Sequence, residues 1–418
     1  MKVLIVNTSE HTGGAAVAAS RLCEALINNG VKAKMLVCHK ESDSLYVVPS
    51  GSWLQKRFCF LWERIVIWLN DLLDRTNLFK VSIANVGQDI TRLPEFREAD
   101  VIHLHWVNQG FLSCRSIEKI LKSGKPVVWT MHDMWEATGI CHHAYECDRY
   151  TEVCGHCPFL KLSFGHDLSY HTFRRKQKML SAARQLHFVA VSEWLSNRCR
   201  QSALIGRFPI TVIPNGISLS SFTYTERDDA RTTLGIEEPY VMVFGAARID
   251  EPIKGFGYLI DALQMLVDEG RFRSDEVRLL LFGTIRDPQQ LHQIPVRYTH
   301  LGYLKDVDQL SLIYSAANIV VSSSLYETFG QTLIEAQACG CIPVSFDGSG
   351  QTDIITHQQN GFLAERLSVA SLAEGIEWGL HADIPAQQLR RHVARHYAES
   401  VVANQYIKLY ESILHITL

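Results

Sequence analysis

The chain has 418 residues, of which 47% are hydrophobic and 20% charged; this excludes a disordered or fibrous protein and suffices for two or three domains. A formal net charge of -3 gives none of the basic field that nucleic-acid-binding proteins show. The opening residues MKVLIVNTSE indicate a buried strand and not a secretory signal, and most of the eleven cysteines lie singly in apolar stretches, so we expect a cytoplasmic protein.

Short apolar segments alternate with stretches of helical periodicity along the first half of the chain. This alternation is typical of a parallel sheet covered by helices on both faces. The strands that we expect in this half are 3–7, 33–38, 101–106, 126–132, 187–192 and 210–214. The clearest helices are expected at 15–29 and 112–123.

A pair of glycines follows the first expected strand. Gly13 and Gly14 open the helix at 15–29, so backbone amides and the positive end of a helix dipole are offered to a ligand. The loop lacks the third glycine and the acidic partner of a dinucleotide-binding fingerprint. Because a glycine pair at such a turn is commonly structural, this loop alone is a weak indication of a binding site.

Segment 53–73 is the longest apolar stretch of the sequence. It does not span a membrane, because it carries charged residues that each cost ~2.5–3.5 kcal/mol at a bilayer centre. One helical face collects Leu54, Phe58, Leu61, Ile65, Trp68, Leu69 and Leu72, and the other Lys56, Glu63, Asn70 and Asp74. We favour a helix whose apolar face packs on the core. The alternative is contact with a membrane surface, because aromatic residues are frequent and Arg57, Arg64 and Arg75 flank the apolar face.

A cluster of cysteines forms an insertion at 141–157. The pattern C-x5-C-x6-C-x2-C comprises Cys141, Cys147, Cys154 and Cys157. Such spacing fits a structural zinc loop, and a histidine from His142, His143 or His156 could replace one ligand. Two disulfides or buried free thiols are the alternatives, and we favour zinc because disulfides are rare in the cytosol. The loop would brace the edge of a cleft without taking part in a reaction.

A second series of strands and helices follows the turn at Asn215-Gly216 and a charged connector at 223–238. Its expected strands are 240–246, 277–283, 299–304, 318–324 and 341–346. Its expected helices are 255–270, 307–316, 331–339 and 368–380. We therefore predict an α/β protein with two Rossmann-like domains facing across a cleft, 1–216 and 217–398, and a C-terminal helix within 399–418 that packs on either domain.

Two cations follow the first strand of this second series. Arg248 and Lys254 stand where a parallel sheet binds ligands, and two positive charges suit a diphosphate leaving group. A lone arginine and lysine are usually solvated surface charges, which is the alternative here.

Two glutamates strengthen the interpretation as a ligand site. Glu327 lies before Gly330, and Glu335 lies on the helix that Gly330 opens. The amides of Gln331, Thr332 and Leu333 are offered to an anion at this helix start, and a carboxylate beside it accepts hydrogen bonds from sugar hydroxyls. Asp306-Val307-Asp308 is formally a metal-binding D-x-D, but it begins a helix, where aspartate commonly caps, and we reject it as a metal site.

These motifs resemble those of the glycogen-synthase-like retaining glycosyltransferases of family 4, over nearly the whole chain. The E-x7-E element matches Glu327 and Glu335, and the R-x5-K pair matches Arg248 and Lys254. The glycine loop, the histidine His132 in WTMHDMW and the junction IPNGI at 213–217 also match. The stretch HDMWEATGICHHAYECDRYTEVCGHCP looks like the colanic-acid and exopolysaccharide branch.

The resemblance implies a GT-B fold and metal-independent transfer of a sugar from a nucleotide-sugar donor, with retention of anomeric configuration. It implies that Arg248 and Lys254 bind the donor diphosphate and that Glu335 binds the ribose hydroxyls. Glu327 and the segment Phe329-Gly330 would lie against the donor sugar. His132 would lie near the same sugar, and the main chain of Tyr303 and Leu304 by the nucleobase. The acceptor implied is a glycan, lipid-linked in this branch, so that the enzyme would be cytoplasmic or peripheral on the inner membrane.

Three departures from the family pattern leave every donor contact in place. Thr328 replaces a frequent proline, and Ser218 replaces a frequent aspartate. Asp353 replaces the usual glutamate, and this third change could alter the acceptor or domain closure. A nucleotide-sugar epimerase of the same architecture is one rival, and it would need acid and base carboxylates in the first domain. A non-catalytic paralogue is the other, but it would be expected to lose the Arg–Lys or Glu pair.

Overall fold

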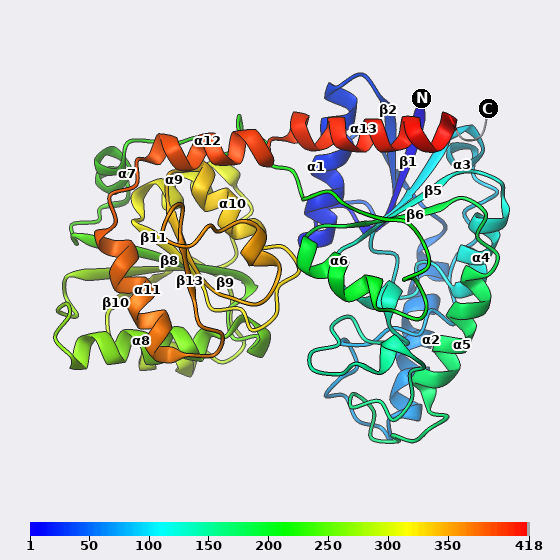
Figure 1. Cartoon of the computed structure of the whole chain (residues 1–418), viewed down its shortest axis with the longest axis horizontal. Coiled ribbons are helices and arrows are strands. Elements are labelled where there is room, and N and C mark those ends of the chain that lie inside the picture. The colour runs from blue at the N-terminus through cyan, green and yellow to red at the C-terminus, as the bar shows by residue number, and fades with distance from the viewer. Residues whose placement is uncertain (416–418) are drawn as a thin grey trace. The chain divides into compact units, whose positions relative to one another are not determined.

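The computed structural model describes residues 1–415, which fold into two compact units (Figure 1). Unit 1 comprises Met1–Pro214 together with the C-terminal helix from Val402, and unit 2 comprises Asn215–Val401. Each unit has a parallel sheet with helices on both faces, so the predicted α/β class with two Rossmann-like domains is confirmed.

Unit 1 is built on a seven-stranded sheet of order β3-β2-β1-β4-β5-β6-β7. All neighbouring strands pair in parallel. The strands are β1 (Lys2–Ser9), β2 (Lys32–His39), β3 (Val47–Pro49), β4 (Val101–Leu104), β5 (Val127–Met131), β6 (Leu186–Ala190) and β7 (Ile210–Val212). Central strands such as β4 and β5 are buried along their whole length, as helices on both faces require.

The helices of unit 1 connect these strands. They are α1 (Gly14–Asn28), α2 (Trp53–Asn70), α3 (Pro94–Glu98), α4 (Cys114–Lys122), α5 (Leu168–Leu180) and α6 (Glu193–Arg200), with short 3-10 turns η1 (Trp135–Ala137) and η2 (Arg149–Thr151). The long C-terminal helix α13 (Glu399–His415) returns to this unit, where Tyr406 and Tyr410 enter the same core as α1 and strands β1 and β2. The C-terminal helix therefore packs on the first unit.

Unit 2 repeats the plan with a six-stranded parallel sheet of order β10-β9-β8-β11-β12-β13. Its strands are β8 (Tyr240–Arg248), β9 (Val277–Thr284), β10 (Arg297–His300), β11 (Ile319–Ser322), β12 (Ile342–Phe346) and β13 (Phe362–Ala364). Its helices are α7 (Arg227–Leu234), α8 (Phe256–Asp268), α9 (Val307–Ala316), α10 (Gln331–Ala338), α11 (Val369–His381) and α12 (Ala386–His396). Three further 3-10 turns are η3 (Pro252–Lys254), η4 (Pro288–Gln293) and η5 (Gly350–Asp353).

Some expected elements of the chain are corrected by the structure. The connector predicted at 223–238 contains helix α7, which was not expected because its sequence is polar. Gly235 ends this helix in a left-handed conformation (φ 64°). The strand expected at 299–304 lies earlier, as β10, so Tyr303 and Leu304 fall in the loop after it.

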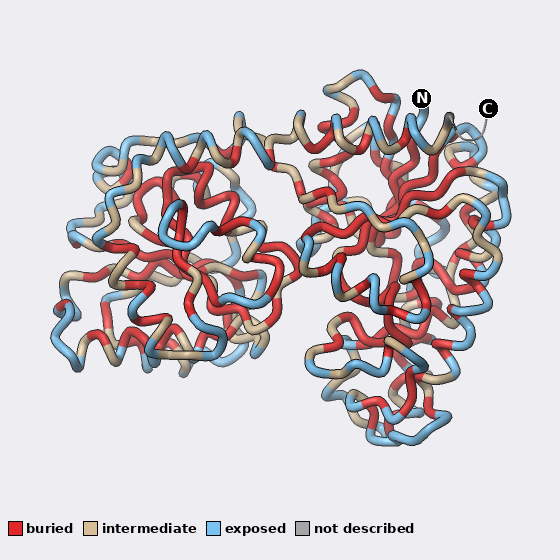
Figure 2. Tube along the Cα trace, viewed as in Figure 1, coloured by how far each residue is buried: buried red, intermediate tan, exposed pale blue. Residues whose placement is uncertain are grey.

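Helix α2 contradicts the favoured interpretation of segment 53–73. Its apolar face points to solvent: Leu54 is 72% exposed, Phe58 59% and Trp62 47%. The side that faces the protein instead buries Cys59, Glu63, Arg64 and Ile67. In Figure 2 the tube alternates accordingly between buried and exposed segments in this part of unit 1. Within residues 1–415, no helix is both long and apolar enough to cross a membrane.

Candidate active site

The two predicted cations lie at the carboxyl edge of the sheet of unit 2, where Arg248 is the last residue of β8 and Lys254 follows in η3. A bulge between Gly245 and Arg248 interrupts the pairing of β8 with β9, which resumes at Arg248 and Thr284 before the chain enters η3. Arg248 forms ion pairs with Glu251 and, at 3.7 Å, with Asp250. Lys254 ends η3, and its Nζ lies 2.8 Å from Oε2 of Glu327. The structure thus places a residue of the R-x5-K pair against one of the E-x7-E pair.

A close backbone approach holds these two loops together. Gly255 adopts a left-handed conformation (φ 65°), and a Cβ there would lie 2.0 Å from the carbonyl oxygen of Ser323. The amide of Leu325 donates to the carbonyl of Ile253 at 2.8 Å, and the Ser323 hydroxyl donates to the Gly255 carbonyl at 2.8 Å. Only glycine fits at 255, so the position of Lys254 beside Glu327 is set by the backbone.

The loop of Glu327 is fixed from its other side by the segment at 349–350. The Glu327 amide donates to the Ser349 hydroxyl at 3.2 Å, and the Gly350 amide donates to the Glu327 carbonyl at 2.8 Å. Phe329 is buried, with its ring 5.9 Å from that of Tyr397. The side chain of Phe329 therefore belongs to the core, and only its backbone is left for the predicted contact with a sugar.

Helix α10 begins beside this loop. Gly330 precedes it in a left-handed conformation (φ 108°), so the first turn of α10 starts directly after the Glu327 loop. The amide of Leu333 already donates to the Gly330 carbonyl at 3.0 Å, so it is a weaker candidate for anion binding than predicted. Glu335 is buried in the second turn.

The loop predicted to meet a nucleobase lies at the same edge of unit 2. Tyr303 is exposed and Leu304 partly buried, and the loop follows β10. The Gly283 amide at the end of β9 donates to the Gly302 carbonyl at 2.7 Å, which ties this loop to the central strands. Asp306 caps α9 by accepting from the Asp308 amide at 2.9 Å, so the D-x-D acts as a helix cap, as expected.

Unit 1 carries the remaining predicted site residues at the carboxyl ends of its strands. Gly13 has a left-handed conformation (φ 93°) that disfavours any other residue, and the space beside Gly13 and Gly14 is open. Both glycines stand at the start of α1, after β1. His132 follows β5 directly.

His132 is partly buried and lies beside the buried histidines His103 and His105. Its Nε2 shares a hydrogen bond of 2.9 Å with Nδ1 of His105, and the two rings stack with centroids 5.1 Å apart. Behind them, His103 shares hydrogen bonds with Thr130 at 2.8 Å and with Tyr410 of α13 at 2.7 Å. Burial lowers the pKa of His132 to about 4 and that of His103 to about 3. The imidazole of His132 is therefore neutral at physiological pH and suits a hydrogen bond to a sugar hydroxyl.

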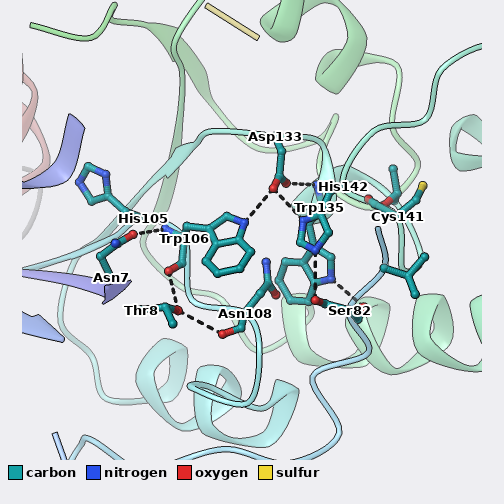
Figure 3. A network of polar contacts seen from close by, with 12 residues as sticks. Asn7, Thr8, Ser82, His105, Trp106, Asn108, Asp133, Trp135, Cys141 and His142 are labelled. Carbon is teal, nitrogen blue, oxygen red and sulfur yellow. Dashed lines mark hydrogen bonds and ion pairs between the residues drawn. The ribbon is translucent and has the colours of Figure 1, made fainter. Parts of the chain in front are cut away.

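Sequence reasoning missed the acidic centre of this edge, Asp133 (Figure 3). Its carboxylate accepts from the Trp106 indole at 2.8 Å, from His142 Nδ1 at 2.7 Å and from the Trp135 amide at 2.7 Å. Burial alone would raise its pKa, but the charge and hydrogen bond of His142 outweigh burial and lower it to about 2. The available signal was position, because Trp106 and Asp133 follow adjacent parallel strands, where polar side chains meet.

The four cysteines of the predicted zinc loop line one small cavity with Thr138, Tyr150 and Phe159 among its other walls. Burial raises the pKa of Cys141 to about 12 and that of Cys154 to about 11, and the Gly139 amide donates to Cys154 Sγ at 3.2 Å. Over residues 1–415, however, no three His, Cys, Asp or Glu side chains are grouped so that they could hold a metal ion. The four thiols line the same cavity, but within residues 1–415 they are not arranged as metal ligands. Structural zinc therefore stays a prediction.

The fold and these loops define the class of protein. Two α/β units, each with a parallel sheet and polar loops at its carboxyl edge, are the architecture of the GT-B glycosyltransferases. The sequence model described as Glycosyltransferase Family 4 matches residues 12–221, and the one described as Glycosyl transferases group 1 matches 226–396. The chain belongs to glycosyltransferase family 4.

Individual relatives agree with this family. An uncharacterized glycosyltransferase of Methanocaldococcus jannaschii is 25% identical over 371 residues, which cover 80% of this chain and 90% of the relative. A phosphatidyl-myo-inositol mannosyltransferase of Mycobacterium tuberculosis is 31% identical over 239 residues, or 54% of this chain and 59% of that protein.

Solved structures share the fold over the full length. Sucrose-phosphate synthase of Thermosynechococcus elongatus superposes with a TM-score of 0.68 at 18% identity, covering 100% of both chains. HepE of Anabaena, solved in complex with UDP and glucose, gives a TM-score of 0.64 at 17% identity over 99% of this chain and 100% of that one.

Proposed function

We propose that this glycosyltransferase moves a sugar from a nucleoside-diphosphate sugar to a glycan acceptor with retention of anomeric configuration. The observation that carries the proposal is the ion pair of Lys254 with Glu327, which brings a cation suited to a diphosphate within 2.8 Å of a carboxylate suited to sugar hydroxyls. The family membership and the structural likeness to HepE, which was solved with UDP and with UDP-glucose, support a nucleotide-sugar donor.

Within this proposal the residues of unit 2 hold the donor. Arg248 and Lys254 bind the diphosphate, the amides of Gln331 and Thr332 add partial positive charge, and Glu335 accepts from the ribose hydroxyls. These groups stabilise the negative charge that grows on the departing diphosphate, so that no catalytic metal ion is required by the scheme. The neutral imidazole of His132 orients the sugar by a hydrogen bond.

The proposed reaction takes place on one face of the sugar. The bond between the anomeric carbon and the diphosphate oxygen breaks while the acceptor oxygen bonds to the same carbon from the same side. The acceptor proton passes to the departing diphosphate oxygen, which balances the charge of the leaving group. Glu327 lies beside this centre and stabilises the positive charge that develops on the sugar ring.

We further propose a lipid-linked glycan acceptor in bacterial exopolysaccharide synthesis, with the enzyme at the cytoplasmic face of the inner membrane. The stretch from His132 to Pro158, with its four cysteines, supports the exopolysaccharide branch. The name of the mycobacterial relative, a phosphatidyl-myo-inositol mannosyltransferase, pairs sugar transfer with a lipid.

The proposal is tested first by thermal shift with a panel of nucleotides and nucleotide sugars. One nucleoside diphosphate and its sugar derivative should raise the melting temperature of the wild type and have a much smaller effect on Lys254→Ala. If no nucleotide stabilises the protein, or if the variant responds as the wild type does, the donor site is assigned wrongly.

A further inference from the structure

Helix α2 is amphipathic with the polar side turned inward. Glu63 is fully buried and accepts hydrogen bonds from the amides of Ile83 and Ala84, both at 2.8 Å. Arg64 forms an ion pair with Glu63 at 2.9 Å and donates to the carbonyl of Val81 at 3.1 Å. Rotating the apolar face toward the core would turn Glu63 and Arg64 outward and leave the amides of Ile83 and Ala84 without their acceptor, so the observed orientation is set by the polar residues.

The inner face of α2 also approaches the loop at Gly110 closely. A Cβ on Gly110 would lie 2.6 Å from the backbone of Cys59 and of Phe60, so the helix backbone itself rests on the loop at Gly110. This contact helps to fix the orientation in which the apolar residues of α2 face outward.

The outward face carries exposed apolar side chains, and we call this surface the α2 face. Its members, each at least 42% exposed, are Trp53, Leu54, Phe58, Leu61, Trp62, Ile65, Leu69, Leu72, Leu73 and Phe79. Figure 1 shows α2 at the end of unit 1 that lies away from α13. The Asn77 side chain donates to the carbonyl of Phe159 at 3.1 Å, so the loop that carries the exposed residues Leu162 and Phe164 lies beside this face.

The charges around the α2 face are of one sign. Between residues 51 and 80, the exposed charged residues are Arg57, Arg75 and Lys80. Of the three acidic residues in the same span, Glu63 and Asp71 are buried and Asp74 is paired with Lys161 at 3.1 Å. Arg57 lies over the Trp53 ring at 5.3 Å and Arg75 over the Trp68 ring at 5.8 Å, which places cations among the aromatic residues.

We propose that the α2 face docks on the headgroup region of an anionic lipid bilayer. Aromatic and aliphatic side chains bordered by arginine are the composition of helices that lie in a membrane interface, and cations add attraction to anionic lipids. A second copy of this chain is a poorer occupant, because two like-charged faces would meet across a symmetric contact. The inference follows from the orientation of α2 and does not rest on the proposed function.

The test is sedimentation of the full chain with sucrose-loaded vesicles, in the absence of donor and acceptor. Vesicles of phosphatidylcholine with phosphatidylglycerol should bind the wild type, and vesicles of phosphatidylcholine alone should bind it at least fivefold less. Phe58→Ser combined with Trp62→Ser should weaken binding to the anionic vesicles at least tenfold. Leu367→Ser, which changes an exposed leucine of unit 2, is the matched control and should bind as the wild type does.

Two further measurements keep the result unambiguous. The melting temperature of each variant should stay close to that of the wild type, because the replaced side chains are exposed. Light scattering without vesicles should give the mass of a single chain for all of them. Absence of wild-type binding, equal binding of the double variant, or a wild-type dimer that the double variant dissociates would each overturn the proposal. Arg57→Gln combined with Arg75→Gln tests the contribution of the cations separately. It should lower binding to the anionic vesicles severalfold, although the apolar side chains are unchanged.

Discussion

Arg248 and Lys254 are the residues on which donor binding is expected to depend most. A hydrogen bond to a charged group is worth roughly 1.5–3 kcal/mol, so alanine at either position should lower kcat/KM for the nucleotide sugar at least tenfold. Initial-rate kinetics measures this loss. Arg273→Ala removes an arginine that is paired only at the surface of unit 2 and serves as the control. Normal kinetics in both site variants would contradict the diphosphate assignment.

The two glutamates of the E-x7-E element should differ in their effects, Glu335 on nucleotide binding and Glu327 on turnover. Glu335→Gln should weaken binding of the free nucleoside diphosphate, because the lost interaction is with ribose. Glu327→Gln should lower kcat at least tenfold while nucleotide binding changes little, because Glu327 is assigned to the sugar. Isothermal titration with the nucleoside diphosphate, beside turnover measurements, distinguishes the two, and the reverse pattern would show that the roles are exchanged.

The histidine group that joins β4, β5 and α13 makes the stability of unit 1 dependent on pH. A histidine whose folded pKa lies below its unfolded value of about 6.5 contributes full stability above that value and loses it as the pH falls toward the folded pKa. For His132, with a folded pKa of about 4, the free energy of unfolding should fall by about 2 kcal/mol between pH 7 and pH 5. Urea denaturation at the two pH values checks this. His132→Gln should reduce the dependence, and an unchanged slope would contradict a neutral His132.

The four cysteines of the loop at 141–157 are predicted to bind zinc, which would stabilise this loop. If Cys141, Cys147, Cys154 and Cys157 hold structural zinc, elemental analysis of protein purified without chelators should find about one zinc per chain. Chelation should then lower the melting temperature, because structural sites contribute ~10–16 kcal/mol of apparent binding energy. Cys199→Ser, which changes a buried cysteine outside the loop, should leave the metal content unchanged. Absence of zinc together with four freely titrating thiols would show that the loop is held by packing alone.

The elements that the sequence predicted well are those with a strong period. The central strands and helices α1, α8, α9 and α10 fall close to their expected ranges, because glycine or a capping aspartate bounds their periodic apolar positions. Short edge strands such as β3 and β13 have three residues each and too little pattern to be recognised. Helix α2 shows the limit of periodicity: the period fixed the helix, but only the partners of Glu63 and Arg64 decided which face turns inward.

The candidate site was predictable where a motif is local and less so where it depends on packing. The R-x5-K and E-x7-E spacings identified Lys254 and Glu327, and the structure adds their ion pair. Asp133 was missed because its role arises from Trp106 and His142, which lie on other segments. The position of Asp133 just after β5 was the available signal, but position alone does not name the partners of a carboxylate.

At the scale of the whole molecule, two Rossmann-like units divide the proposed work. Unit 2 presents cations, glutamates and a helix start for a nucleotide sugar. Unit 1 presents neutral histidines beside an ionised aspartate, together with the exposed α2 face. This division suits an enzyme that holds its donor on one unit and meets a membrane-bound acceptor with the other.

The measurement that tests the central claim most directly is transfer itself, followed on the full chain with the nucleotide sugar selected by thermal shift and a lipid-extracted glycan acceptor. Release of the nucleoside diphosphate and the anomeric proton coupling of the product are recorded by nuclear magnetic resonance. The account predicts acceptor-dependent release and a product with the anomeric configuration of the donor, both lost in Lys254→Ala. An inverted product, or conversion of the nucleotide sugar into its epimer without transfer, would contradict it.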